Sequence, residues 1–140
     1  MDKRKEGLDP EFRAKLETFE KRLLESGIRV KMTCGYRSIE EQNRLYALGR
    51  TQPGKIVTNA RGGRSWHNFG LAADYAFVIG GQLTWNGPWK VFGRIAKECG
   101  LEWGGDWLKF PDRPHVQWRK GKSLTDLRRA AGLSSAIPQA

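Results

Sequence analysis

The sequence predicts a small α+β domain in which helices flank a small antiparallel sheet. Three observations lead to this prediction. Segments with apolar residues at helical spacing are interspersed with segments in which apolar and polar residues alternate. A glycine pair separates two strand-like segments, as in an antiparallel hairpin. A chain of 140 residues can bury one substantial core but is short for two domains.

The first predicted elements are a helix and a strand. Asp9 followed by Pro10 is typical of a helix start, and Gly27 is typical of a helix end. Residues 28–34 alternate between apolar and polar side chains, which predicts a half-buried strand. The apolar residues behind these predictions are Phe12, Leu16, Phe19 and Leu23 in the helix, and Ile28, Val30, Met32 and Cys34 in the strand.

A second helix and a long loop follow. Ser38 and Glu41 form a capping-box pattern, and we expect the helix to run through Leu48 and to end at Gly49. Residues 50–66 contain a Pro-Gly and a Gly-Gly pair and are predicted to be a loop. Loops of this length without regular structure are usually functional or disordered.

The second half of the chain supplies the rest of the sheet. Residues 71–78 are apolar at nearly every position and predict a buried strand, which the following glycine pair turns into a hairpin. A third helix is expected over residues 88–99. Two short strands are expected within residues 101–107 and 115–119.

The chain shows neither internal repeats nor a linker between domains. Ser123 is expected to cap a last short helix over residues 125–131, and residues 134–140 are expected to fray. The predicted boundaries are 1–140 for a single domain, about 8–122 for its core and 123–140 for a basic C-terminal tail.

Composition narrows the possible partners. The formal net charge of +10 suggests an anionic partner, such as nucleic acid, a membrane surface or an acidic wall polymer, although a soluble surface can also simply be basic. No segment approaches the roughly 20 apolar residues of a membrane-spanning helix. The first twelve residues lack the apolar core of a signal peptide, so export by the general secretory route is not expected.

The strand predicted over residues 71–78 contains a carboxylate, Asp74. Both faces of this strand are apolar, so Asp74 is expected to be buried. A buried ion without a partner is costly. A salt bridge to an arginine, hydrogen bonds from backbone amides or a metal ion could each compensate this charge.

The two histidines favour the metal ion, although a histidine is more often an ordinary packed or exposed residue. His67 lies just before the strand of Asp74, and His115 lies late in the chain among aromatic residues. Two imidazoles and one carboxylate form a set typical of catalytic zinc, with a fourth position for water. Cys34 and Cys99 lack metal-ligand spacing to a histidine, so they are expected to be buried free thiols outside the site.

A zinc hydrolase also needs a general base near the water. Asp112, three residues before His115, is the first candidate; Glu102 and Asp106 are rivals, and each could be a solvated loop charge. Arg37 lies at a strand-to-helix corner, where it could bind a substrate carboxylate or an oxyanion or be a surface charge. Four tryptophans could line a groove or simply pack: Trp66, Trp103, Trp107 and Trp118.

Four motifs together carry a resemblance to a known family. They are GYRS at 35–38, SWHNFGLAADYAF at 65–77, EWGGDW at 102–107 and DRPHVQW at 112–118. In this order they resemble zinc peptidases related to D-alanyl-D-alanine carboxypeptidases, in the branch of L-alanyl-D-glutamate endopeptidases found in phage endolysins and bacterial wall hydrolases. The resemblance runs from about Cys34 to about Trp118. It implies the small α+β fold shared with the signalling domain of hedgehog proteins.

The resemblance implies a metal site and a base. His67 and Asp74 match the SxHxxGxAxD motif of the family and would be zinc ligands, with His115 as the third. The acid three residues before that histidine would be the general base. It is often Glu in the carboxypeptidases and is Asp112 here.

Three further residues complete the expected site. Arg37 matches the family arginine that contacts the substrate beside the metal. Ser65 occupies the first position of the SxHxxGxAxD motif and is expected to help to orient the site and to bind substrate. Trp107 is expected to bind substrate as a groove-lining tryptophan.

The functional prediction is a zinc-dependent peptidoglycan endopeptidase that hydrolyses the L-Ala–D-Glu bond of the stem peptide and lyses bacteria. One alternative is a D,D-carboxypeptidase or dipeptidase that acts on D-Ala-D-Ala ends. Another is a basic nucleic-acid-binding domain that uses its tryptophans for stacking. A wall-binding module with an inactive site is a third, but the expected ligands and base are all present in the sequence.

The expected partners are the stem peptide and an anionic wall or outer-envelope surface, with no nucleic acid, and the expected state is a monomer. An endolysin without a signal peptide would be made in the host cytoplasm. It would then need a membrane pore formed by another protein to reach the wall.

Overall fold

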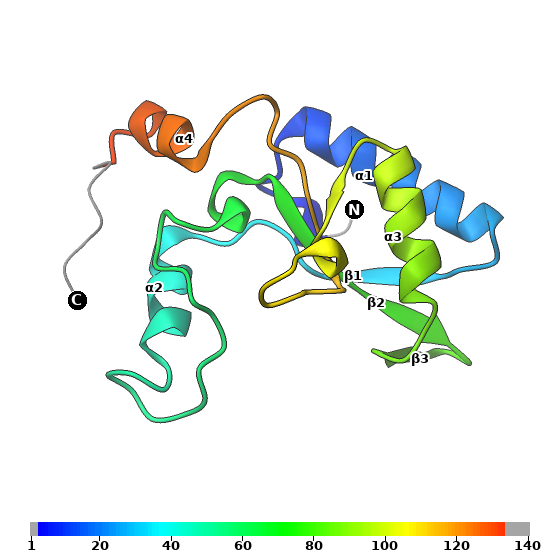
Figure 1. Cartoon of the computed structure of the whole chain (residues 1–140), viewed down its shortest axis with the longest axis horizontal. Coiled ribbons are helices and arrows are strands. Elements are labelled where there is room, and N and C mark those ends of the chain that lie inside the picture. Colours follow the sequence, from blue (N-terminus) through cyan, green and yellow to red (C-terminus); the bar gives the residue numbers. More distant parts are fainter. Residues whose placement is uncertain (1–2, 134–140) are drawn as a thin grey trace.

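The computed structural model describes residues 3–133, which form a five-stranded sheet with helices around it (Figure 1). The α-helices and strands are α1 (Pro10–Glu25), β1 (Val30–Cys34), α2 (Ile39–Ala47), β2 (Ala72–Ile79), β3 (Gln82–Thr84), α3 (Trp89–Glu98), β4 (Glu102–Trp103), β5 (His115–Gln117) and α4 (Leu124–Ala130). Three 3-10 helices are η1 (Lys3–Lys5), η2 (Trp66–Phe69) and η3 (Gly104–Asp106). No helix among the described residues has both the length and the apolarity to cross a membrane.

β2 is the central strand of the sheet, and all of its neighbours are antiparallel to it. β1 pairs with one edge, while β5 and β3 pair with successive parts of the other edge. β4 extends the sheet beyond β5. Asp74 is paired with Cys34 of β1 and with His115 of β5. The register therefore brings segments that are far apart in the sequence to one point of the sheet.

The main core lies between the sheet and the helices α1 and α3. The ring of Phe19 on α1 lies edge-on to Tyr75 of β2, with 5.7 Å between ring centroids, and to Phe92 of α3, with 5.1 Å. Side chains alternate along a strand, so Tyr75 faces these helices and Asp74 faces the opposite side. The four apolar residues predicted for the first helix are fully buried: Phe12, Leu16, Phe19 and Leu23.

Truncation of Phe19 to alanine is expected to lower the free energy of unfolding by about 3–5 kcal/mol, because the cavity left beside the rings of Tyr75 and Phe92 cannot collapse fully. Urea denaturation measures this change. Leu24→Ala on the same helix is the matched control, since Leu24 is 55% exposed. An equal loss in the two variants would contradict the position assigned to Phe19.

The prediction of an α+β fold with an antiparallel sheet is confirmed. The predicted N-terminal caps of three helices are also confirmed. The side chains of Asp9, Ser38 and Ser123 each accept a hydrogen bond from a backbone N–H of the first turn. The Gly-Gly hairpin between β2 and β3 is present as well. The tail over residues 134–140 lies outside the described residues.

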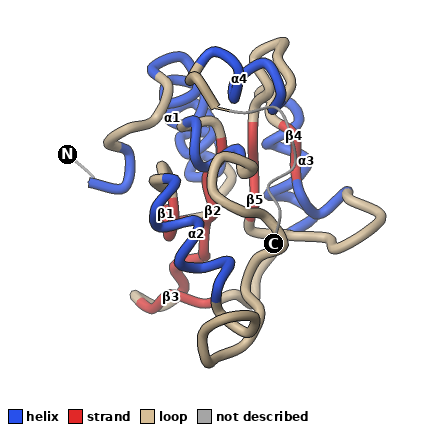
Figure 2. Tube along the Cα trace, turned by 90° about the vertical axis from the view of Figure 1, so that its left-hand side faces the viewer, coloured by secondary structure: helices blue, strands red, loops and turns tan. Residues whose placement is uncertain are grey.

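Some local predictions were wrong. The strand after α1 begins at Val30 rather than at residue 28, and residues 104–106 form η3 instead of continuing a strand. Glu41 pairs with Arg44, so its side chain does not close the capping box. The predicted loop does extend away from the sheet after α2 (Figure 2), but its last residue, Trp66, already belongs to η2.

Candidate metal centre and active site

A cavity of about 290 Å³ opens where β2, β5, η2 and the loops around them meet. All seven residues predicted for the site line it: Arg37, Ser65, His67, Asp74, Trp107, Asp112 and His115. The remaining lining residues are Val57, Thr58, Ala60, Arg64, Trp66 and Gln117. The structure thus brings together residues that are spread over 79 positions of the chain, from Arg37 to His115 inclusive.

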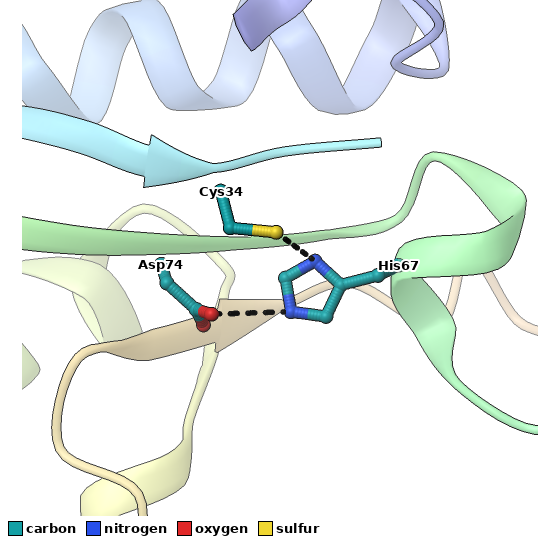
Figure 3. Close-up of side chains that lie close together, drawn as sticks. All are labelled: Cys34, His67 and Asp74. Carbon is teal, nitrogen blue, oxygen red and sulfur yellow. Dashed lines mark hydrogen bonds and ion pairs between the residues drawn. The ribbon is translucent and has the colours of Figure 1, made fainter. Parts of the chain in front are cut away.

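Asp74 lies between two imidazoles at the centre of this site. His67 Nε2 is 3.5 Å from Asp74 Oδ2 (Figure 3), and His115 Nδ1 is 3.0 Å from Asp74 Oδ1. The sequence predicted that Asp74 is buried, but its side chain is 23% exposed, so the burial is only partial. Because Asp74 lines the cavity, its charge is accessible to a ligand bound there.

The η2 helix fixes the direction of His67. Ser65 Oγ accepts the backbone N–H of His67 at 3.2 Å, and Asn68 Oδ1 accepts the N–H of Ser65 at 3.2 Å. Asn68 Nδ2 also donates to the carbonyl oxygen of Arg37 at 2.9 Å. A short capped turn therefore holds His67 against the chain that leaves β1.

The outer nitrogen of each imidazole is engaged by an acceptor. His67 Nδ1 lies 2.8 Å from the carbonyl oxygen of Gly35, and His115 Nε2 lies 2.7 Å from Gln117 Oε1. These oxygens can only accept, so the outer nitrogens carry protons and donate. The inner nitrogens of both rings, which face Asp74, can then act as ligands.

The electrostatics of the site favour positive charge beside Asp74. Burial opposes a charge on His67, but hydrogen bonds to Asp74 and Cys34 outweigh it and raise the pKa of the imidazole to about 10. Burial likewise opposes the Asp74 carboxylate, yet hydrogen bonds from His115 and His67 hold its pKa well below the usual range. The carboxylate of Asp74 therefore stays ionised and would attract a metal cation.

The donor set fits a divalent transition metal. Imidazole nitrogens and one carboxylate are typical ligands of zinc, and metal-bound histidines usually donate their outer N–H to an oxygen, as both do here. Candidate ligand atoms of Asp74, Asp112 and His115 lie within 4.8 Å of one another, and so do those of Cys34, His67 and Asp74. Asp74 belongs to both groups, so a metal ion at this carboxylate would lie beside both imidazoles.

Asp112 lies on the rim of the cavity, with Oδ2 3.9 Å from His115 Nδ1. Its backbone N–H donates to the carbonyl oxygen of Gly104 at 2.9 Å. A Cβ at Gly104 would lie 2.3 Å from the Asp112 carbonyl oxygen, so glycine permits this close approach. Burial and the charge of Asp74 raise the pKa of Asp112, which makes it a stronger base than an ordinary aspartate.

The two rival acids are engaged elsewhere. Asp106 pairs with Lys97 at 2.9 Å. Glu102 accepts hydrogen bonds from Gln117 Nε2 at 2.9 Å and from Arg119 Nε at 2.9 Å. Neither acid lines the cavity. The geometry therefore favours Asp112 over both as the base.

Cys34 is closer to the site than the sequence indicated. Its Sγ lies 3.8 Å from His67 Nδ1, the side of the ring away from Asp74 (Figure 3), and 3.1 Å from Arg37 Nη2. Burial raises the pKa of the thiol, but the hydrogen bond to His67 and the charges of His67 and Arg37 outweigh it, and the pKa is lowered. Cys34 and Cys99 are free thiols, as predicted, but both are only partly buried, and Cys34 contacts His67 of the candidate site.

Gln42 is a site residue that the sequence did not reveal. It is completely buried, and its Oε1 accepts a hydrogen bond from Arg37 Nη1 at 2.9 Å. Its Nε2 donates to the carbonyl oxygen of Ala60 at 2.7 Å and to Thr58 Oγ1 at 3.2 Å. A glutamine within an amphipathic helix gives no signal of such a role. Gln42 joins Arg37 to the loop that forms one wall of the cavity.

The tryptophans divide between the cavity and the core. Trp107 lies over His115, with 5.1 Å between ring centroids, and lines the cavity together with Trp66. Trp103 is buried in the core, and its Nε1 donates to the carbonyl oxygen of Arg113 at 2.7 Å. Trp118 packs against the core. Only two of the four candidates therefore border the site.

Gln117→Leu is expected to weaken metal binding by about 10- to 100-fold, because His115 loses the acceptor that orients it. Gln117 is also buried, and its Nε2 donates a hydrogen bond to Glu102. Loss of this hydrogen bond should lower the free energy of unfolding by about 1–3 kcal/mol. Competitive chelation and urea denaturation measure the two effects. Gln82→Leu on β3, where Gln82 is exposed, is the control and should leave metal affinity unchanged.

Two family models match the chain, and both are described as D-alanyl-D-alanine carboxypeptidase. One matches residues 58–118, and the other, VanY, matches residues 5–87, more than half of the chain. The first match contains His67, Asp74 and His115; the second contains Arg37.

Individual relatives are similar to this chain over part or most of its length. The peptidoglycan L-alanyl-D-glutamate endopeptidase CwlK of Bacillus subtilis is 48% identical over 102 residues, which cover 65% of this chain and 61% of CwlK. The L-alanyl-D-glutamate peptidase of Listeria phage A118 is 36% identical over 78 residues, which cover 52% of this chain and 28% of that protein. The chain thus spans less than two thirds of either curated relative.

A solved structure extends the comparison to the fold. The L-Ala D-Glu endopeptidase ChiX of Serratia marcescens superimposes with a TM-score of 0.59 and 27% sequence identity, over 82% of this chain and 83% of ChiX. Together with the two family models, this similarity agrees with the fold described above. The chain belongs to the D-alanyl-D-alanine carboxypeptidase family.

Proposed function

We propose that this chain is a zinc-dependent endopeptidase that hydrolyses the L-Ala–D-Glu bond of the peptidoglycan stem peptide. The observation that carries this proposal is the pair of imidazoles that face Asp74, each with its outer nitrogen held by an oxygen acceptor, beside Asp112 in one cavity. The activities named for CwlK, the phage A118 peptidase and ChiX support the choice of bond.

His67, Asp74 and His115 would hold the zinc ion. A bound zinc ion would supply Lewis acidity, which polarises the scissile carbonyl and makes a water molecule more acidic. The hydrogen bonds to Gly35 and Gln117 keep the two rings in the tautomers that binding requires. β2 and β5 hold Asp74 and His115 in register, so little rearrangement is needed to form the site.

Asp112 accepts the proton of the attacking water and passes it to the leaving amine. Its raised pKa suits both steps, since it must release the proton that it takes up. Arg37 donates N–H groups to substrate oxygens from a fixed position, because Gln42 and Cys34 hold its guanidinium. Ser65 and Trp107 border the same cavity, where they would contact a bound peptide.

The family description also allows a carboxypeptidase, and a pair of synthetic stem peptides separates the two activities. An endopeptidase cleaves a peptide with an amidated C-terminus as well as one with a free C-terminus, because the bond it cuts lies within the chain. A carboxypeptidase requires the terminal carboxylate. We expect equal cleavage of both peptides by zinc-loaded protein; selective loss with the amidated peptide would assign the carboxypeptidase activity instead.

The place of action would be the cell wall, where the substrate lies. The net charge of +10 would draw the enzyme to anionic wall polymers or to the outer envelope. We propose that the protein acts as a monomer and is released to the wall through a pore made by another protein. Recovery of active protein in the wall fraction of cells without a pore-forming partner would contradict this route.

A further inference from the structure

A second cavity adjoins the candidate active site. Its volume is about 400 Å³. Its lining residues come from the end of α2, the loop before η2 and the start of α4; the helices α2 and α4 lie on the left of Figure 1. Ala60 and Arg64 line both cavities, so the two hollows share a wall. The residues that line the second cavity are Tyr46, Asn59, Ala60, Arg61, Arg64 and Leu124, none of which is acidic.

A tight turn at residues 61–64 (RGGR) presents its two arginines to this cavity. The N–H of Arg64 donates to the carbonyl oxygen of Arg61 at 2.9 Å and closes the turn. Asn43 Oδ1 on α2 accepts the N–H of Gly62 at 2.8 Å, and Asn68 Oδ1 on η2 accepts the N–H of Gly63 at 3.0 Å. The turn is therefore anchored on both sides.

Glycine is required at both inner positions of the turn. A Cβ at Gly62 would lie 2.6 Å from Asn43 Oδ1 and 2.6 Å from the carbonyl oxygen of Ile39. Gly63 has φ +79°, a conformation that other residues adopt only with strain. Arg61 and Arg64, the two outer residues of this fixed turn, both line the cavity.

Further arginines make the surroundings strongly positive. The guanidinium of Arg61 lies over the ring of Tyr46 at 5.1 Å, and that of Arg50 lies over the same ring at 3.9 Å. The hydrogen bond and charge of Arg61 lower the pKa of Tyr46. Arg128 Nη1 donates to the carbonyl oxygen of Gly63 at 2.8 Å, and burial and the charge of Arg64 lower the pKa of Arg128.

We propose that the turn at residues 61–64 is a specificity subsite that binds a carboxylate of the substrate through Arg61 and Arg64. Planar guanidinium groups bind carboxylates through two parallel hydrogen bonds. D-Glu in the stem peptide is linked through its side-chain carboxyl, which leaves its α-carboxylate free close to the bond that would be cut. The inference rests on the proposed function, because the substrate is taken to be the stem peptide. Arg64 borders both cavities and so connects the cleavage site to this subsite.

Binding of a leaving-side fragment tests the subsite without turnover. Isothermal titration calorimetry would compare γ-D-glutamyl-lysine, which has the free α-carboxylate, with its α-carboxamide, on zinc-loaded protein. We expect the wild type to bind the carboxylate form at least about tenfold more tightly, as charge-assisted hydrogen bonds require. Arg61→Gln and Arg64→Gln should each lose most of this preference, and Arg64→Lys should recover only part of it.

Arg94→Gln is the matched control, since Arg94 is exposed on α3 and the change in net charge is the same. The control should keep the full preference. The proposed subsite would be contradicted if the wild type bound the carboxylate and carboxamide forms equally. It would also be contradicted if Arg94→Gln lost the preference for the carboxylate form as much as Arg61→Gln and Arg64→Gln.

Cleavage of an L-Ala–D-Glu peptide, measured in parallel, separates the subsite from the proposed function. A preference for the carboxylate form without cleavage supports the subsite and contradicts the function. Cleavage without any preference contradicts the subsite alone.

Discussion

Asp74→Asn is expected to remove bound zinc and to lower peptide cleavage by at least about 1,000-fold. The carboxylate is the anionic member of the donor set and lies 3.0 Å from one imidazole and 3.5 Å from the other. A neutral amide is a poor zinc ligand, and the metal would contribute several kcal/mol to stabilisation of the transition state. Elemental analysis after dialysis, together with a peptide cleavage assay, measures the two losses.

Asp106→Asn is the control for this result, because Asp106 lies outside the cavity and pairs with Lys97 on the surface. It should keep about one zinc ion per chain and full activity. Zinc retained by Asp74→Asn at the wild-type level would show that the ion binds elsewhere.

Asp112→Ala is expected to lower cleavage by about 100- to 10,000-fold while the protein still binds zinc. Asp112 is 47% exposed and lies 3.9 Å from His115, so it is not needed to hold the imidazoles in place. The loss should be in the catalytic rate rather than in metal content. Single-turnover kinetics and elemental analysis on the same preparation measure the two quantities.

The rival acid Glu102 provides the comparison for Asp112. Glu102→Gln removes a charge that is engaged by Gln117 and Arg119 and should change cleavage much less than Asp112→Ala. A greater loss of rate in Glu102→Gln would assign the base to Glu102. Loss of zinc in Asp112→Ala would instead make Asp112 a metal ligand.

The parts of the fold that follow local patterns could be predicted from the sequence. The first helix has a strict apolar spacing and an Asp-Pro start, and its four apolar residues are buried as expected. η2 could not be predicted in the same way, because a single capped turn of four residues has no periodicity. Its hydrogen bonds depend on Asn68 reaching back to Ser65 and across to Arg37.

The site residues were predictable where their chemistry is rare, and hidden where it is common. A carboxylate in an apolar strand and two isolated histidines stand out in any sequence, and the structure places all three in one cavity. Gln42 and Gln117 are ordinary polar residues until the sheet register and the loop bring them to Arg37 and His115. Cys34 was missed because β1 adds an irregularity between Met32 and Cys34, which no spacing rule indicates.

The most direct test is digestion of purified peptidoglycan by zinc-loaded wild-type protein and by Asp112→Ala, with new amino termini identified by mass spectrometry. We predict new D-Glu amino termini with the wild type and almost none with the variant. Release of free D-Ala would identify a carboxypeptidase. No new amino terminus from zinc-loaded wild-type protein would contradict the proposal that this chain is a peptidoglycan endopeptidase.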